Sequence, residues 1–368
     1  MNKYLPKKPS IVLLGATGCV GRILVNLLDR RHDINLTLAG RNMDQLNNLS
    51  LACKHPGAIV QVDLDKPGSL SEAVQDTADT IINCTGRYRE NGLHVAQTAA
   101  EHGLNLIDIA DEPVYLQEVV SLDALAKAHT CSLIIGSGTA PQTTGALIKS
   151  SLEIMGHGVD VKLGICFGIN KVGLNAIRTA TEAVGGLIAL KSMNNIWQKG
   201  ALIDFQKPFS RLWVRHYPLP ETVYLPAMEG VDTWLAGVCL SSPFLNTVVA
   251  MLRHTGLAQK LASSRLPLRL FCSINSLIET GLSSSRRGNL GIALHVEVRQ
   301  GGKARISYLY HYDMAELTAQ AAAITLDHLL RTGSGKGGVY LAHNFMDSNL
   351  FLKHLEASGI VWSLMEVP

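Results

Sequence analysis

The residues of this chain that are most typical of a known chemistry form the glycine motif GATGCVG. The motif follows an apolar run and opens an amphipathic stretch, so we expect a strand, a turn and a helix around it. In that setting, backbone N–H groups and the amino end of the helix can bind the pyrophosphate of a dinucleotide. Gly15 would permit the tight turn, Gly18 the close approach of the ligand, and Gly21 the packing of helix on strand. A turn without a ligand is the alternative. The predicted cofactor-binding residues are Gly15, Ala16, Thr17, Gly18, Cys19, Val20 and Gly21.

The end of the second predicted strand indicates which dinucleotide is bound. NAD enzymes usually place a carboxylate there for the ribose hydroxyls, whereas NADP enzymes need positive charge. The strand ends in Arg41 and Asn42, and Asp33 precedes it, at the wrong end. A guanidinium paired with the 2′-phosphate would contribute about 1.5–3 kcal/mol. The sequence therefore predicts NADP(H) in preference to NAD(H), with a solvated arginine as the alternative.

Further cofactor contacts are predicted where the third and fourth strands end, because ligands of open α/β sheets bind outside the carboxyl ends of the strands. Asp63 ends the third strand, where its carboxylate can accept a hydrogen bond from the adenine amino group or simply form a turn. Cys84, Thr85 and Gly86 end the fourth strand, where the backbone is expected near the nicotinamide ribose.

Candidate catalytic residues follow the fourth and fifth strands. Hydride transfer requires from the protein mainly orientation and a source of protons, since the cofactor supplies the reactive bond. Arg87 is predicted to bind a substrate carboxylate, and Tyr88 or Asp111 to relay the proton. Asp108 lies in the same acidic stretch. Such residues also cap helices and form turns, so a structural role remains the alternative.

Spacing argues against several other chemistries. The Tyr-x-x-x-Lys pair of short-chain dehydrogenases occurs only as Tyr4 and Lys8, before the first strand. The 13 histidines include no HExxH and no cluster at metal-ligand spacing, so no metal site is predicted. A semialdehyde or phosphate-linked dehydrogenase would carry a nucleophilic cysteine; Cys131 begins an apolar strand and is expected in the core. That class is kept as a minor alternative.

The order of apolar and amphipathic segments predicts two domains that position these residues. Short β-branched runs alternate with helical stretches up to residue 137, which predicts an α/β, doubly wound Rossmann domain over residues 1–137. Residues 138–312 predict a second, α+β domain on a mostly antiparallel sheet, with a hairpin turn at Gly301 and Gly302. Residues 313–368 begin with a long helix and are expected to pack back on the Rossmann domain.

Composition sets limits on partners and location. With 47% hydrophobic and 17% charged residues, the chain is expected to fold as a globular protein. A net charge of +3 is too small to indicate a surface that binds nucleic acid. The seven cysteines form no CxxC pair and residues 1–10 lack the apolar core of a signal peptide, so a cytoplasmic location is expected. The apolar stretch 235–252 contains Pro243 and Asn246, which favours a buried or interfacial segment over a transmembrane span.

Several segments together resemble the saccharopine dehydrogenase-like (saccharopine reductase) family. Besides GATGCVG and AGRN, these are NCTGRYRENGLHVAQTAAEHGLNLIDIADE, GSGTAPQTTGALI and GGVYLAHNFMDSNLFLKHLEASGI. The sequence departs from the family at Arg87, where a proline is usual, at Thr98 and Ala99, where an Ala-Cys pair is common, and over residues 172–183 in the substrate domain. The resemblance implies hydride transfer with a nicotinamide cofactor and a homodimer formed through the sheet of the second domain, but it names no acceptor.

Three functions remain open from the sequence. The first is an NADP-dependent oxidoreductase of an imine or amino-acid substrate. The second is an NADP-dependent enoyl-type (C=C) reductase of a lipid or polyketide intermediate, which an apolar substrate domain containing Trp197, Trp213 and Trp234 would suit. The third is a dinucleotide-binding protein without turnover.

Overall fold

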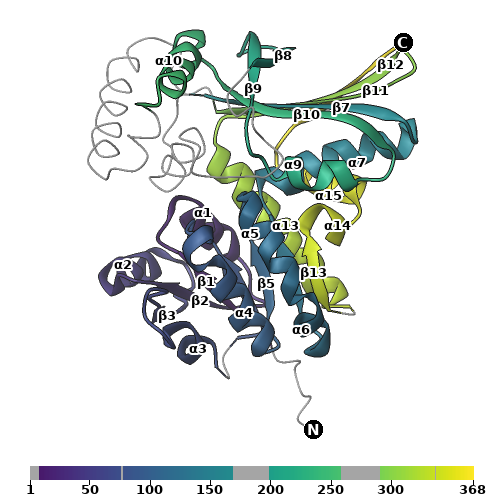
Figure 1. Cartoon of the computed structure of the whole chain (residues 1–368). Coiled ribbons are helices and arrows are strands. Elements are labelled where there is room, and N and C mark those ends of the chain that lie inside the picture. Colours follow the sequence, from purple (N-terminus) through teal and green to yellow (C-terminus); the bar gives the residue numbers. More distant parts are fainter. Residues whose placement is uncertain (1–7, 76–77, 169–198, 258–290, 336) are drawn as a thin grey trace. The chain divides into compact units, whose positions relative to one another are not determined.

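The computed structural model describes residues 8–75, 78–168, 199–257, 291–335 and 337–368 (Figure 1). Tyr4, Trp197 and the segment 172–183 considered above lie outside these ranges. The chain forms two compact units, each made from two stretches of sequence. The first comprises Met1–Gln142 and Ala315–Asp347, and the second comprises Thr143–Met314 and Ser348–Pro368.

The first unit is built on a seven-stranded sheet in which every pair of neighbours is parallel. Its order is β13-β6-β5-β4-β1-β2-β3, so the chain returns to the middle of the sheet after β3 and continues outward on the other side of β1. Loops that follow β1 and β4 therefore lie at the switch point where such sheets bind ligands. The strands are β1 (Ser10–Leu14), β2 (Asn35–Gly40), β3 (Ala58–Gln61), β4 (Thr80–Asn83), β5 (Asn105–Asp108), β6 (Ser132–Ile135) and β13 (Gly338–Leu341).

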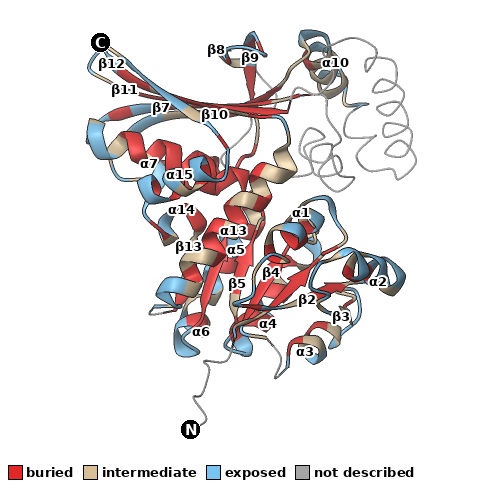
Figure 2. Ribbon diagram, turned by 180° about the vertical axis from the view of Figure 1, so that it is seen from behind, coloured by how far each residue is buried: buried red, intermediate tan, exposed pale blue. Residues whose placement is uncertain are grey.

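Helices cover both faces of this sheet, because alternate strand residues point to opposite faces and both sets are apolar. Ile11 and Leu13 pack in a core with α1 and α13, whereas Val12 and Leu14 pack with α4, α5 and α6 (Figure 2). The predicted doubly wound Rossmann fold is thus confirmed. The helices are α1 (Cys19–Leu28), α2 (Met43–Ala52), α3 (Ser69–Val74), α4 (Leu93–Glu101), α5 (Pro113–Val119), α6 (Asp123–Ala128), α13 (Met314–Thr332) and α14 (Ala342–Phe345).

The second unit contains a mixed, mostly antiparallel seven-stranded sheet of order β14-β12-β11-β7-β10-β9-β8, in which β7 and β10 run parallel. Gly301 and Gly302 form the predicted hairpin turn with φ of 53° and 93°. Helix α7 (Thr144–Met155) packs against β11 and against α15 (Ser348–Ala357). The strands are β7 (Val159–Phe167), β8 (Lys199–Asp204), β9 (Arg211–His216), β10 (Val231–Leu240), β11 (Ile292–Gln300), β12 (Lys303–His311) and β14 (Trp362–Val367).

The structure differs from the expected domain boundaries at residues 348–368. The sequence predicts that all of residues 313–368 pack on the Rossmann domain, but this last stretch belongs to the second unit. The physical reason is strand pairing: β14 extends the second sheet, with Trp362 opposite Leu309 on β12. The expected long helix is present as α13, and of the two strands that follow it, β13 joins the first sheet and β14 the second.

The apolar stretch 235–252 is divided between two elements. Its first part completes β10, and Ser242 then caps α10 (Pro243–His254) by accepting a hydrogen bond from Leu245 N–H at 3.3 Å. Across the ranges described above, no helix combines the length and the apolar character needed to cross a bilayer.

Candidate functional site

The turn after β1 has a backbone that only glycine accommodates at its first position. Gly15 has φ of 75°, and its N–H and that of Ala16 donate to Ala39 O at 3.0 and 3.2 Å. A Cβ on Gly15 would lie 2.7 Å from Cys84 O, at the end of β4. The turn is therefore packed directly on the main chain that leaves the neighbouring strand.

The amino end of α1 is held equally close to this turn. A Cβ on Gly21 would lie 2.2 Å from Gly15 O, and Gly18 N–H donates to the same oxygen at 2.9 Å. Gly18 is the N-cap, no side chain caps the helix, and its first turn contains no acidic residue. Backbone N–H groups and the positive end of the helix dipole are thus available to an anion. The residues present fit a dinucleotide pyrophosphate.

The end of β2 has the charge expected for NADP. Arg41 is exposed, and Asp33 lies before β2, where it pairs with Arg31 at 2.6 Å. The Asn42 side chain accepts a hydrogen bond from Gln45 N–H at 3.0 Å and so caps α2. Asn42 therefore has a demonstrated structural role, while its predicted contact with the cofactor stays a prediction.

Asp63 organises the turn after β3. Its Oδ1 accepts a hydrogen bond from Asp65 N–H at 3.3 Å, and its carbonyl accepts one from Lys66 N–H at 2.9 Å. Its own N–H donates to Ser69 Oγ at 3.0 Å. These bonds favour the turn-forming role that the sequence left open, and contact with adenine stays a prediction.

The segment after β4 is fixed by the side chain of Asn83. Asn83 Oδ1 accepts hydrogen bonds from Thr85 N–H at 3.2 Å and from Thr85 Oγ1 at 2.8 Å. Gly86 follows with φ of 68°. Burial raises the pKa of the Cys84 thiol well above its ordinary value, so this thiol stays protonated and is no nucleophile.

Asn83 in turn contacts a buried carboxyl on the next strand. Asp108 accepts hydrogen bonds at Oδ2 from Tyr115 Oη at 2.8 Å and from Asn83 Nδ2 at 3.1 Å, and at Oδ1 from Ala110 N–H at 2.7 Å. The side chain is fully buried, and this burial raises the pKa of Asp108 to about 7. The sequence predicts Asp108 near the site but does not predict this network. The available signal was an aspartate at a strand end followed seven residues later by a tyrosine.

Of the three predicted catalytic residues, Tyr88 is the most constrained. It begins a π-helical turn, η1 (Tyr88–Gly92), stacks on Tyr115 at 5.5 Å between ring centroids, and donates from Oη to Asn83 O at 3.1 Å. Burial raises the pKa of its phenol well above the ordinary value. A proton relay by Tyr88 stays a prediction, and the structure gives this side chain a packing role in addition.

Arg87 and Asp111 are more accessible. Arg87 Nη1 pairs with Asp65 at 2.8 Å, so a substrate carboxylate would compete with an exposed aspartate for this guanidinium. Asp111 is exposed, and the protein atoms around it raise the pKa of its carboxyl above the ordinary value. A carboxyl with a raised pKa, on an exposed residue beyond the end of β5, suits a role in proton transfer.

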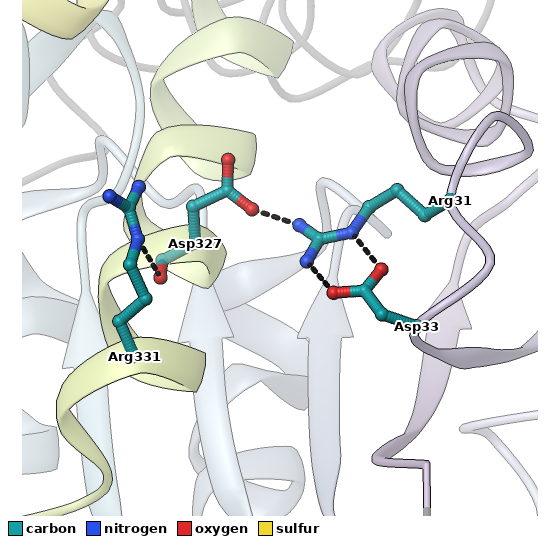
Figure 3. Close-up of polar contacts among 4 residues, drawn as sticks. All are labelled: Arg31, Asp33, Asp327 and Arg331. Carbon is teal, nitrogen blue, oxygen red and sulfur yellow. Dashed lines mark hydrogen bonds and ion pairs between the residues drawn. The ribbon is translucent and has the colours of Figure 1, made fainter.

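A separate cavity of 580 Å³ lies in the first unit between α1 and α13. Among the residues that line it, Arg31 bridges Asp33 and Asp327, and Arg331 Nε donates to the Asp327 carbonyl at 3.2 Å (Figure 3). Arg31 and Asp33 precede β2, so the cavity adjoins the amino ends of the strands and not the glycine turn. It is therefore not the dinucleotide site. Within the described ranges, no group of three or more His, Cys, Asp or Glu side chains could hold a metal ion.

Fold and turn together define a Rossmann-type domain with the features of a dinucleotide-binding site. Residues 11–140 match the family model described as the saccharopine dehydrogenase NADP binding domain, which confirms the preference for NADP. The match and the similarity to saccharopine dehydrogenase-like oxidoreductases agree with the resemblance that the sequence motifs indicated.

Similarity to individual proteins covers part of the chain in each case. The human saccharopine dehydrogenase-like oxidoreductase is 24% identical over 269 residues, covering 67% of this chain and 58% of that protein. A Mycobacterium tuberculosis protein that carries the name of a trans-acting enoyl reductase is 28% identical over 134 residues, covering 35% of this chain and 32% of that protein. The chain thus spans from about a third to somewhat over half of these relatives.

A solved structure extends the likeness to the whole fold. Saccharopine dehydrogenase (L-Glu forming) from Saccharomyces cerevisiae superposes with a TM-score of 0.67, covering 98% of this chain and all of that one, at 15% identity. The superposition supports a shared fold of both units. At this low sequence identity it does not indicate the substrate.

Proposed function

We propose that this protein is an NADP-dependent oxidoreductase that transfers a hydride to or from an imine or amino-acid type substrate. The observation that carries the proposal is the glycine turn packed on the end of β4, with Arg41 at the end of β2. When bound, the nicotinamide supplies the hydride, and the protein supplies orientation and protons.

The proposed cofactor residues surround that edge of the sheet. The turn at residues 15–21 would hold the pyrophosphate, Arg41 and Asn42 the 2′-phosphate end, and Cys84 to Gly86 the nicotinamide ribose. Asp63 would lie near the adenine. Each of these segments follows a strand of the same sheet at its carboxyl end.

The proposed chemistry rests on Asp111 and Arg87. Asp111 would give a proton to the substrate nitrogen or take one from it, because the residue reaches solvent while the protein atoms around its carboxyl raise the pKa. Arg87 would bind a substrate carboxylate in place of Asp65. Tyr88 would relay protons only if its hydrogen bond to Asn83 O were exchanged.

Cofactor titration comes first. We expect NADPH to bind at least about tenfold more tightly than NADH, since a charge-assisted pair is worth about 1.5–3 kcal/mol, and Arg41→Ala to remove this margin. Cofactor fluorescence measures both affinities. Equal binding of the two cofactors by the wild type would contradict the role of Arg41, and no binding of either would contradict the proposal as a whole.

Turnover then distinguishes the substrate classes. With the imine proposal, loss of NADPH absorbance requires a carbonyl compound and an amino acid together, and neither suffices alone. Asp111→Asn should lower kcat by about a hundredfold or more while leaving NADPH affinity unchanged. Glu118→Gln, an exposed carboxylate on α5, is the matched control and should retain full turnover.

The second candidate is an enoyl-type reductase, favoured by the partial match to the mycobacterial protein. It predicts that NADPH is consumed by an enoyl thioester with no amine present. Binding of NADPH without turnover of either substrate class would instead support the non-catalytic alternative.

We also propose a cytoplasmic homodimer. β14 is the end strand of the second sheet, and Leu364 and Met365 on it are 40% and 50% exposed. Exposed apolar edge strands tend to be covered in native proteins. Light scattering should therefore give twice the chain mass of 39.7 kDa, and a monomer would contradict the proposal. A tagged chain found in an organelle would contradict the location.

A further inference from the structure

The buried polar network at the ends of β4 and β5 has a defined direction of hydrogen bonding. Asp108 is fully buried, and the three groups that contact its carboxyl, Tyr115 Oη, Asn83 Nδ2 and Ala110 N–H, all donate. Three donors around one carboxyl match a carboxylate, which only accepts. The network therefore sets how each partner side chain is oriented.

The most consequential partner is the Asn83 amide. Because its Nδ2 donates to Asp108, its Oδ1 points the other way and accepts from Thr85 N–H and Thr85 Oγ1. If the amide were reversed, an NH₂ group would face the two Thr85 donors. The carboxylate of Asp108 thus fixes the main chain of Thr85 through a single intervening side chain.

That main chain forms one wall of the proposed cofactor edge. Cys84, between Asn83 and Thr85, is the residue whose carbonyl packs on Gly15, and Asn83 O is held by Tyr88 Oη at 3.1 Å. We propose that Asp108 is a positioning residue for the bound dinucleotide, which acts by orienting Asn83 and so the Cys84–Gly86 segment. This inference rests on the proposed function, since it concerns how that site holds its cofactor.

The protonation state of Asp108 controls the network. The titratable groups that face it are Cys84 after β4, Tyr88 on η1, Tyr115 on α5 and Asp111 in the loop after β5, each of them neutral or negative. Burial raises the pKa of the Asp108 carboxyl to about 7. A proton on Oδ2 turns this acceptor into a donor; Tyr115 Oη can reverse and accept from it, but Asn83 Nδ2 cannot, so the Asn83 bond is opposed. The segment is therefore held more firmly above about pH 7 than below it.

Two variants and a control test the inference. Their affinity for NADPH is measured by cofactor fluorescence from about pH 6 to about pH 8. Asp108→Asn places an NH₂ group among donors and should weaken binding at least tenfold at the upper pH. Asp79→Asn is the matched control: Asp79 also accepts from a backbone N–H, of Ser10 at 2.7 Å, but at the amino edge of the sheet. It should bind NADPH as the wild type does.

The pH profile separates positioning from simple loss of folding. Wild-type affinity should fall as pH drops through about 7, and Asp108→Asn should keep only the weaker dependence that comes from the cofactor phosphate, which titrates near pH 6. Tyr115→Phe removes a hydrogen bond that lowers the pKa of Asp108, so the midpoint of its profile should move upward. This second variant serves if Asp108→Asn does not fold.

The outcomes are distinct. The inference is overturned if Asp108→Asn binds NADPH with an affinity within twofold of the wild type, or if the midpoint of the pH profile does not move in Tyr115→Phe. Either result leaves the proposed function intact, because the wild type still binds NADPH. Absence of NADPH binding by the wild type overturns the proposed function and the inference with it.

Discussion

Alanine in place of Gly21 would have two opposite effects on the stability of α1. Inside a helix, alanine is favoured over glycine by about 1 kcal/mol. At this position, however, the new Cβ would lie 2.2 Å from Gly15 O and 2.9 Å from both Cα and O of Ala16. The start of α1 would have to move by about 1 Å, and such overpacking costs about 1–3 kcal/mol. With three atoms too close, the upper value applies and the net loss is about 2 kcal/mol.

The expected result is a fall in Tm of roughly 4–8 °C for a unit of this size, together with weaker NADPH binding, because the shifted N–H groups belong to the proposed pyrophosphate site. Gly57→Ala is the matched control. Its Cβ would lie 2.4 Å from Leu36 O, at the amino edge of the same sheet, so stability should fall while NADPH affinity stays the same. Thermal unfolding and cofactor fluorescence measure the two effects. A Gly21→Ala protein as stable as the wild type, or equal loss of binding in both variants, would refute the reasoning.

Three further predictions follow from single contacts. Asn42→Ala removes the side-chain cap of α2 and should lower the free energy of unfolding by about 1 kcal/mol in a denaturant titration; no loss would contradict the cap. The pKa of Asp108 is raised to about 7, above the unfolded value of 3.8, so the unfolding free energy should decrease as pH rises from about 4 to about 7, and a wild-type slope retained in Asp108→Asn would exclude this carboxyl as its source. Arg31→Ala breaks the partly exposed bridge to Asp33 and Asp327 (Figure 3) and should cost at most about 1 kcal/mol, less at high salt; a salt-independent loss would indicate packing and not charge.

Local signals in the sequence were sufficient for the first unit. Apolar strands, each followed by an amphipathic stretch, permit a parallel sheet covered on both faces, and the glycine spacing places Gly15 and Gly21 where no side chain fits. The hairpin at Gly301 and Gly302 was likewise local. In these cases the residues that determine the structure are neighbours in the chain.

Partners distant in sequence could not be predicted in the same way. The alternation of β14 fits an end position in either sheet, and only its pairing with β12 decides between them. The hydrogen bonds of Asp108 to Asn83 and Tyr115 depend on the register of β4 with β5 and on where α5 begins. Asn42 was predicted as a cofactor ligand, although an asparagine just before a helix is also the usual signal of an N-cap.

The order in which the two sheets are completed has a consequence for biosynthesis. β13 and β14 are made after the other described strands of their sheets, and each occupies the end position of a different sheet. A nascent chain that reaches only residue 337 has made six of the seven strands of each sheet, and β6, with Leu133 and Ile135 on it, presents an unpaired backbone edge. Such edges can template pairing with another chain. Slow translation before residues 338–341 would therefore extend the period in which the nascent protein is most prone to aggregate and most dependent on chaperones.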